Sequence, residues 1–467
     1  MNTNFNIGTR LKKTNIRPNA GESQRQQAID FLEELFGEVG GREVGVRLWD
    51  GTIWPDETPR RVTLQLNHLD ALSAMFRDGT ELALAEAYIF NDFDIVGDIQ
   101  RVFRLSSALA EVTSGWRKKL RAAMMLRRMP RAAGHTPGRR GPARLAGKLH
   151  SIKRDRQAVA YHYNVSNEFY ELWLDRNMVY SCAYFHTPDQ DIDTAQEQKL
   201  DYICRKLRLR PGQRVLDIGC GWGGLAIHAA RHYGVDVTGI TLSQPQADFA
   251  TARILQGKLS EQVRFLVRDY REIKPEESGL FDALVSVGMF EHIGVTNMPV
   301  YFSQAMRLLK PTGVFLNHAI ARRTNDLAVH GPSFTNTYVF PDGELTPIGV
   351  ALNAAEEAGF EARDVESLRE HYALTLGHWV RRLESCHDAA LRVVDEETYR
   401  VWRLYMAGAA HNFATWAVSV YQSLLVKPEA HGVSGQPWTR ADWYAIPVRS
   451  AILPKGLTIK SLHSIIK

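Results

Sequence analysis

The sequence predicts an α/β domain with a doubly wound sheet, and three observations support this fold class. Residues Arg214–Gly224 read RVLDIGCGWGG, an apolar strand-like run, buried on both faces, that enters a glycine loop. The next run, LAIHAARHYG, has helical spacing and ends at Gly234. Strand-like runs follow at Val235–Ser243 and Val263–Glu272. Strands and helices that alternate at this spacing are typical of doubly wound sheets, whose ligands lie over the carboxyl ends of the strands.

The glycine loop predicts a nucleotide site. Gly219, Gly221 and Gly223 have no Cβ, so they permit a tight turn and let a ligand approach the N–H groups at the start of the helix. Asp217 stands at the end of the strand that precedes them. This pattern alone is shared with ordinary loops and with other dinucleotide sites, because the spacing differs little between cofactors.

The residues after the next two strands favour S-adenosylmethionine over NAD. A dinucleotide dehydrogenase would place an acidic residue after the second strand, to bind the ribose. Thr241 stands there instead, and Gln246 follows it. Asp269 and Tyr270 end the third strand, where a carboxylate can accept a hydrogen bond from an adenine amino group.

From about Ala158 to Val426 the chain resembles the cyclopropane-fatty-acyl-phospholipid synthases, a family that includes mycolic acid cyclopropane synthases and fatty acid C-methyltransferases. The motifs YSCAYF and FEHIG, in this order, are the most specific part of the resemblance. Asn164 departs from the family pattern, which usually has Asp in its HYD motif. The resemblance rests on HYNVSNEFYELWLD, MVYSCAYF, LDIGCGWGG, GITLSQPQ, RDYRE, VSVGMFEHIG, FLNHAI, TYVFPDGEL and HYALTL.

The resemblance implies a Rossmann-like class I methyltransferase domain that transfers a methylene carbon from S-adenosylmethionine to a cis double bond. The substrate would be an unsaturated acyl chain of a membrane phospholipid, and the product a cyclopropane chain. The family uses bound bicarbonate as the base. By resemblance, its ligands here are Cys182, Glu291, His318, the backbone of Ile320, and Tyr372.

The resemblance also indicates which residues bind the cofactor. Tyr163, Tyr180 and Ser181 would lie near its methionine end, Thr241 and Gln246 near the ribose. The full predicted set is Tyr163, Tyr180, Ser181, Asp217, Gly219, Gly221, Thr241, Gln246, Asp269 and Tyr270. Aromatic faces can stabilise the carbocation formed on the chain, and the candidates are Tyr163, Tyr180, Tyr184, Phe185 and Phe334.

Several alternatives stay open. Taken singly, Cys182 and His318 are more often structural, and Glu291 could cap a helix; only the joint occurrence of the set favours chemistry. The same residues would also serve a methyl- or methylene-branched product. A nucleic-acid methyltransferase would normally carry an N/D-P-P-Y-type motif where GMFEHIG stands, so no nucleic-acid partner is expected. A non-catalytic lipid carrier would not need the cofactor and bicarbonate sets.

The length of 467 residues predicts two to three domains. We expect an N-terminal lipid-associated α/β domain at 1–115, a basic amphipathic segment and linker at 116–157, the methyltransferase domain at 158–427, and an extension of unknown role at 428–467. Near the end of the methyltransferase domain, the aromatic-rich run from Val394 to Lys427 is expected to be helical. A homodimer is an open alternative to a monomer.

The composition predicts a cytoplasmic protein. The chain has no run of about 18 apolar residues and no apolar segment near its N-terminus. Its four cysteines lack C-x-x-C spacing, so neither a zinc site nor a disulfide framework is indicated.

The net charge of +5 is unevenly distributed, because a basic block extends from Arg117 to Arg156. Such a block can be a solvated linker, a nucleic-acid patch or a membrane-surface patch. In its first half Trp116, Leu120 and Met124 recur at helical spacing beside the charges, as in interfacial helices. This segment therefore predicts peripheral association with an anionic membrane surface, on the inner face of the membrane.

Overall fold

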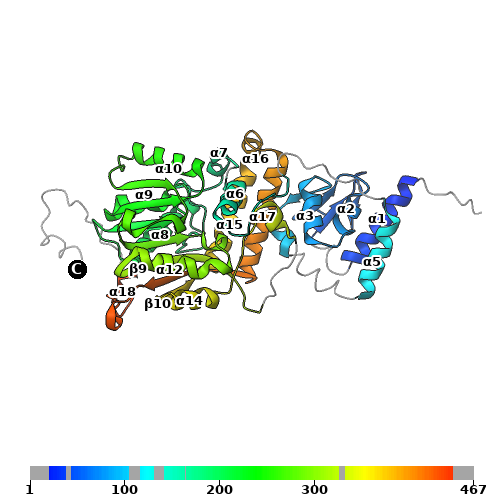
Figure 1. Cartoon of the computed structure of the whole chain (residues 1–467). Helices are drawn as coiled ribbons and strands as arrows, with labels where there is room; N and C mark the ends of the chain where they lie inside the picture. Colours follow the sequence, from blue (N-terminus) through cyan, green and yellow to red (C-terminus); the bar gives the residue numbers. More distant parts are fainter. Residues whose placement is uncertain are drawn as a thin grey trace, which may run out of the picture.

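The computed structural model describes residues 20–37, 44–104, 116–130, 141–163, 165–325 and 332–444. These residues form two sheets, a small one near the N-terminus and a seven-stranded one (Figure 1). Figure 1 shows the small sheet, with helices α1 and α5 beside it, at the opposite end of the molecule from the seven-stranded sheet.

The small sheet has the strand order β2-β1-β3-β4. Its strands are β1 (Val44–Arg47), β2 (Ile53–Trp54), β3 (Val62–Leu66) and β4 (Phe93–Gly97). Alternate residues of β3 are buried, as expected for a strand with one face on a core. The helices of this region are α1 (Ala20–Phe36), α2 (Ala71–Phe76), α3 (Glu81–Ile89) and α5 (Trp116–Arg128). Helix α5 packs against α1 and α2, so it belongs structurally to this region.

The large sheet has the order β10-β11-β9-β8-β5-β6-β7. The five strands from β9 to β7 in this order are parallel, whereas β11 runs antiparallel to both β9 and β10. The strands are β5 (Arg214–Ile218), β6 (Asp236–Thr241), β7 (Val263–Val267), β8 (Phe281–Val287), β9 (Leu309–Arg322), β10 (Glu361–Ser367) and β11 (Val418–Val426). The predicted doubly wound α/β fold is therefore confirmed.

Helices cover both faces of the large sheet, which explains the continuous apolar run of β5. Val215 points into a core shared with α8, α9 and α10, whereas Leu216 and Ile218 point into a core shared with α12 and α14. The bounds of these helices are α8 (Ile192–Lys206), α9 (Gly224–Tyr233), α10 (Gln244–Gln256), α12 (Met298–Leu308) and α14 (Ile348–Glu357).

Further helices and 3-10 turns occur between the strands along the chain. The helices are α6 (Ile152–Tyr163), α7 (Asn167–Glu171), α11 (Pro275–Ser278), α13 (Phe334–Tyr338), α15 (Arg369–Ser385), α16 (His387–Ala390) and α17 (Glu396–Ala414). The 3-10 turns are η2 (Tyr270–Glu272), which follows β7, and η3 (Phe290–His292) and η4 (Val295–Asn297), which follow β8. No helix of the described residues is long and apolar enough to cross a membrane.

The expectation that Val394–Lys427 is helical throughout is wrong. Helix α17 ends at Ala414, Trp416 adopts a positive φ of 62°, and the rest forms strand β11. The segment VSVYQSLLV is rich in β-branched residues and is inserted between β9 and β10. The bend after α17 thus returns the chain to the sheet.

Two buried arginines of α17 join the N-terminal region to the large-sheet domain. Arg400 donates to the backbone oxygen of Tyr88 at 3.0 Å, and Arg403 donates to the Tyr88 hydroxyl at 2.8 Å. Arg403 also donates to Glu384 of α15 at 2.9 Å. Because buried cations are costly without partners, these bonds fix α17 between the two regions.

Part of the C-terminal extension packs against the sheet domain. It contains η5 (Ala430–Gly432) and α18 (Ala441–Tyr444), and α18 contacts α8. The Trp443 side chain is buried there, with Lys206 Nζ 5.6 Å from its ring centroid. The segment up to residue 444 thus extends the core on one face of the sheet.

Candidate functional site

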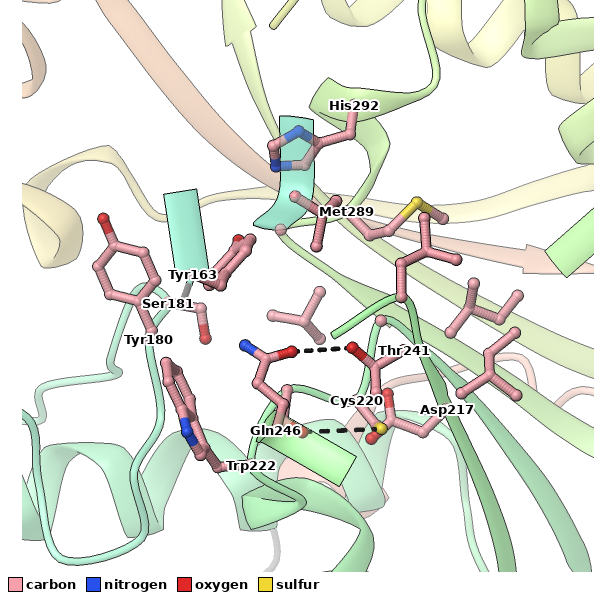
Figure 2. A pocket seen from close by; sticks show the side chains of 18 of the residues that line it. Tyr163, Tyr180, Ser181, Asp217, Cys220, Trp222, Thr241, Gln246, Met289 and His292 are labelled. Atoms are coloured by element: carbon pink, nitrogen blue, oxygen red, sulfur yellow. Dashed lines mark hydrogen bonds between the residues drawn. The ribbon is translucent and has the colours of Figure 1, made fainter. Parts of the chain in front are cut away.

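A pocket opens over the carboxyl ends of β5, β6 and β8, where the fold class places a ligand. Every residue of the predicted cofactor-binding set lines this pocket, and Figure 2 shows Tyr163, Ser181, Asp217, Thr241 and Gln246 around it. The site is thus assembled from segments that lie far apart in the sequence.

The glycine loop forms one wall of the pocket, and its glycines adopt left-handed backbone conformations that allow the tight turn. Gly219 and Gly221 have φ angles of 82° and 53°, and Gly223, with φ of 80°, is the N-cap of α9. A Cβ at Gly221 would meet no other atom within 4 Å, so this position faces open space. A ligand can therefore approach the loop closely.

The predicted ribose side is held by a hydrogen bond between two pocket residues. Thr241 Oγ1 donates to Gln246 Oε1 at 2.8 Å, drawn as a dashed line in Figure 2. Ser243 caps α10 by accepting from the Gln246 N–H. The Gln246 amide nitrogen thus keeps its donors for a ligand, since the carbonyl end binds Thr241.

Asp269 lies on the pocket wall, but its carboxylate is bound to Arg271, which the sequence analysis did not identify. Arg271 Nε and one Nη each lie 2.7 Å from an oxygen of Asp269, and the same Nη lies 2.7 Å from Asp155 of α6. A carboxylate has about four acceptor positions, so Asp269 retains capacity for an adenine amino group. Arg271 also ties α6 to this wall.

Lys199 is a second pocket residue that the sequence analysis missed. Its side chain is 1% exposed, and Nζ donates to Ser181 Oγ at 2.8 Å. Burial lowers the pKa of Lys199 to about 8 and raises the pKa of Asp217 to about 7. A single lysine in an amphipathic helix normally indicates a solvated face, so the sequence held no signal for it.

A buried polar centre lies beside the pocket, around Glu291 in η3. Glu291 Oε1 accepts the backbone N–H of Ile320 at 2.6 Å, and Oε2 is buried with no hydrogen-bond partner. Burial raises the pKa of Glu291 to about 7, opposed by the bond from Ile320. This carboxyl group therefore titrates close to neutral pH.

His318 lies two residues before Ile320, on the same face of β9. Its Nδ1 is 3.2 Å from Nε2 of Gln422, an amide nitrogen that can only donate. His318 Nε2 is buried without a partner in the described structure, and it is a donor in the tautomer that leaves Nδ1 to accept from Gln422. Because burial lowers the pKa of His318 well below its usual value, the ring is neutral.

Cys182 and Tyr372, the other two predicted bicarbonate ligands, are both buried, and each is linked to this centre indirectly. Cys182 Sγ donates to the Leu368 oxygen at 3.6 Å, and the Leu368 N–H donates to Val420, which pairs with Ile320. The pKa of Tyr372 is raised, first by burial and also by nearby groups that include Cys182 and Glu291.

The candidate aromatic faces are divided between different parts of the fold. Tyr163 and Tyr180 line the pocket. Tyr184 instead packs against Tyr202, with ring centroids 4.6 Å apart, whereas Phe185 lies beside His378 and Phe334 beside Tyr338. None of these last three candidates lines the pocket, whereas Trp222 and His292, which the sequence analysis did not select, do. Asn164 lies outside the described residues.

Comparison with known proteins identifies the family to which this chain belongs. The family model for mycolic acid cyclopropane synthetase matches residues 150–423. The chain is 38% identical over 402 residues to a probable fatty acid methyltransferase of Pseudomonas putida, covering 85% of this chain and 95% of that protein. It is 36% identical over 294 residues to the cyclopropane-fatty-acyl-phospholipid synthase of Escherichia coli (strain K12), covering 62% of this chain and 74% of that protein.

Solved structures agree with the sequence comparison. The cyclopropane synthase MmaA2 from Mycobacterium tuberculosis has a TM-score of 0.56 and 32% identity, covering 58% of this chain and 98% of that chain. The mycolic acid cyclopropane synthase CmaA1 complexed with SAH and CTAB has a TM-score of 0.55 and 33% identity, with the same coverage of 58% and 98%. The chain therefore belongs to the mycolic acid cyclopropane synthetase family and is an S-adenosylmethionine-dependent methyltransferase.

Proposed function

We propose that this enzyme adds a methylene carbon from S-adenosylmethionine to the cis double bond of an unsaturated acyl chain in a membrane phospholipid. The product is a cyclopropane chain, and bound bicarbonate is the base. The observation that carries this proposal is the buried polar centre beside the cofactor pocket, with its unpartnered Glu291 Oε2 and His318 Nε2.

The donors and acceptors of this centre fit a bicarbonate ion. The neutral His318 ring can donate from Nε2, and the Cys182 thiol, kept protonated because burial raises its pKa, can donate to the ion in place of the Leu368 oxygen. Glu291 is an acceptor that can bind the hydroxyl group of the ion. When bound, bicarbonate would supply a weak base beside the cofactor pocket.

The protein's own groups hold the reacting atoms and exclude water. The double bond is a poor nucleophile, and fixing it against the sulfonium methyl can supply roughly 7 to 11 kcal/mol of the barrier. Transfer of the methyl group to one alkene carbon breaks the sulfur–carbon bond and leaves a cation on the chain. Ring faces such as those of Tyr163 and Tyr180 can stabilise this cation by about 2 kcal/mol when desolvated.

The fate of the cation distinguishes two products. Loss of a proton from the transferred methyl group closes the ring, whereas loss of a proton elsewhere leaves a branched, unsaturated chain. The chain is 38% identical to a probable fatty acid methyltransferase, so the branched chain is the alternative product. Either product retains every residue of the site.

Product analysis tests the proposal. Purified enzyme is given S-adenosylmethionine and vesicles of a phospholipid with one monounsaturated chain, and the lipids are analysed by mass spectrometry before and after catalytic hydrogenation. A cyclopropane product gains one CH₂ unit and takes up no hydrogen under mild conditions, whereas a branched alkene takes up H₂. Recovery of unchanged lipid with every unsaturated substrate would contradict the proposal.

The proposal extends to how the enzyme reaches its substrate. Trp116, Leu120 and Met124 of α5 form an apolar stripe with side chains 69%, 53% and 47% exposed. Basic residues surround this stripe, whereas the opposite face of α5, with Leu126, is buried against the N-terminal region. An apolar stripe flanked by cations fits the boundary of an anionic bilayer. We assign α5 to the inner face of the membrane, which makes the enzyme a peripheral cytoplasmic protein.

A further inference from the structure

Two buried lysines of helix α8 differ in what neutralises them. Lys206 and Lys199 are seven residues apart, and each is 1% exposed. Lys206 Nζ forms ion pairs with Asp364 and Glu366. No ion pair joins Lys199 to a carboxylate of the described residues, and its Nζ instead donates to Ser181 Oγ. The same helix therefore carries one internally paired lysine and one without a carboxylate partner.

The bonding capacity of Lys199 is mostly unused. An ammonium group has three donors, and the one hydrogen bond found for it in the described structure goes to Ser181 Oγ at 2.8 Å. Asp175 and Asp217 act on Lys199 electrostatically, but neither forms an ion pair with it in the described structure. Asp175 accepts the N–H groups of Asn177 and Val179 with its two oxygens, both at 2.8 Å.

Lys199 lines the cofactor pocket together with Ser181, Tyr180 and Asp217. A buried cation is costly unless an anion pairs with it. The cofactor carries one anionic group, the α-carboxylate at its methionine end. This end is also where the predicted residues Tyr163, Tyr180 and Ser181 lie.

We propose that Lys199, held by Ser181, binds the α-carboxylate of the methionine end of S-adenosylmethionine. Asp217 Oδ2 is buried without a hydrogen-bond partner on the same wall. It supplies an acceptor for the α-ammonium group of the cofactor, which neighbours the α-carboxylate. This assignment rests on the cofactor alone. It is independent of the proposed acyl substrate, base and membrane surface, so their failure would leave it intact.

Ligands that lack the carboxylate test this role without measuring activity. Calorimetry compares S-adenosylhomocysteine with its decarboxylated analogue, which keeps the amine, and with 5′-methylthioadenosine, which lacks the whole amino-acid end. Lys199→Met should weaken binding of S-adenosylhomocysteine about tenfold or more, since hydrogen bonds to charged groups are strong. It should leave the affinity for both truncated ligands within about twofold. Lys206→Met is the matched control and should not discriminate between the three ligands.

A purely structural role gives a different pattern. If Lys199→Met weakens all three ligands equally, or leaves S-adenosylhomocysteine binding unchanged, the assignment is wrong. Lys199→Gln is the second variant in case the methionine variant does not fold, because its amide can still donate to Ser181. It should show the same selective loss for the carboxylate-bearing ligand, and an equal loss for all three would overturn the proposal.

Discussion

Glu291 Oε1 accepts a hydrogen bond of 2.6 Å from the backbone N–H of Ile320. The bond joins turn η3, which follows β8, to the neighbouring strand β9, and it orients a buried carboxyl group beside the cofactor pocket. Only one oxygen is used, because Oε2 has no partner. Glu291 is thus fixed by the sheet while keeping a free acceptor, the arrangement expected of a group that binds a ligand.

Replacing Glu291 by Gln should separate turnover from cofactor binding. The amide keeps an acceptor for the Ile320 N–H but places a donor group where the proposed base needs an acceptor. We expect turnover to fall about 100-fold or more, within the usual range for acid and base groups, with S-adenosylmethionine affinity nearly unchanged. Single-turnover kinetics and calorimetry measure the two quantities. Glu357→Gln, at an exposed position of α14, is the control. Parallel loss of affinity and turnover would contradict the assigned role.

The same variant should change how stability depends on pH. The pKa of Glu291 is raised from 4.5 to about 7 in the folded state, so the folded protein binds more protons than the unfolded chain between these values. Stability contributed by this group is therefore present at low pH and lost as pH rises from about 4.5 to about 7. Because Gln does not ionise, Glu291→Gln should gain about 1–3 kcal/mol in unfolding free energy relative to wild type between pH 5 and pH 8. Denaturant unfolding at both pH values measures this, and a constant difference would contradict it.

The predicted cofactor residues line one pocket because motif residues occupy fixed places in this fold. Gly219, Gly221 and Thr241 sit at strand ends, and parallel strands bring their carboxyl ends to one edge. Lys199 and Arg271 could not be selected, since their roles depend on burial and on partners distant in sequence. The antiparallel strand β11 was mistaken for helix because its aromatic and apolar residues continue those of α17.

Cys182→Ser should also lower turnover and spare cofactor affinity. Burial raises the pKa of the Cys182 thiol, so it acts as a neutral donor and not as a thiolate. A hydroxyl group donates as well, but its shorter bond leaves it farther from the same acceptor. We expect a fall in turnover of about tenfold or more, measured as kcat beside calorimetric affinity. Cys386→Ser, outside the site, is the matched control and should behave as wild type.

Gly221→Val should abolish cofactor binding. Gly221 has φ of 53° and its Cβ direction faces the open pocket, so a branched side chain would both strain the loop and fill the cofactor's space. Gly212→Val is the control, because Gly212 also has a positive φ, of 77°, and open space around it, but it does not line the pocket. Both variants should lose stability, and only Gly221→Val should lose S-adenosylhomocysteine binding by calorimetry. Retained affinity in that variant would remove the glycine loop from the site.

Removing the positive charge of α5 should weaken membrane binding without touching the cofactor site. An anionic leaflet attracts each nearby Lys or Arg by about 1 kcal/mol, and salt screens this attraction within a Debye length of about 10 Å. The variant replaces by Gln the basic residues beside the apolar stripe, which are Arg117, Lys118, Lys119, Arg121, Arg127 and Arg128.

We expect this variant to bind anionic vesicles at least about tenfold more weakly and to show a higher apparent KM for vesicle substrate. Cosedimentation across a salt series measures binding, and calorimetry should find S-adenosylmethionine affinity intact. A control variant neutralises Lys258, Arg264 and Lys274, which are exposed on the large-sheet domain, and should bind vesicles as wild type does. If the α5 variant binds equally well, or if wild-type binding is insensitive to salt, α5 is only a packing helix and another surface must deliver the acyl chain to the pocket.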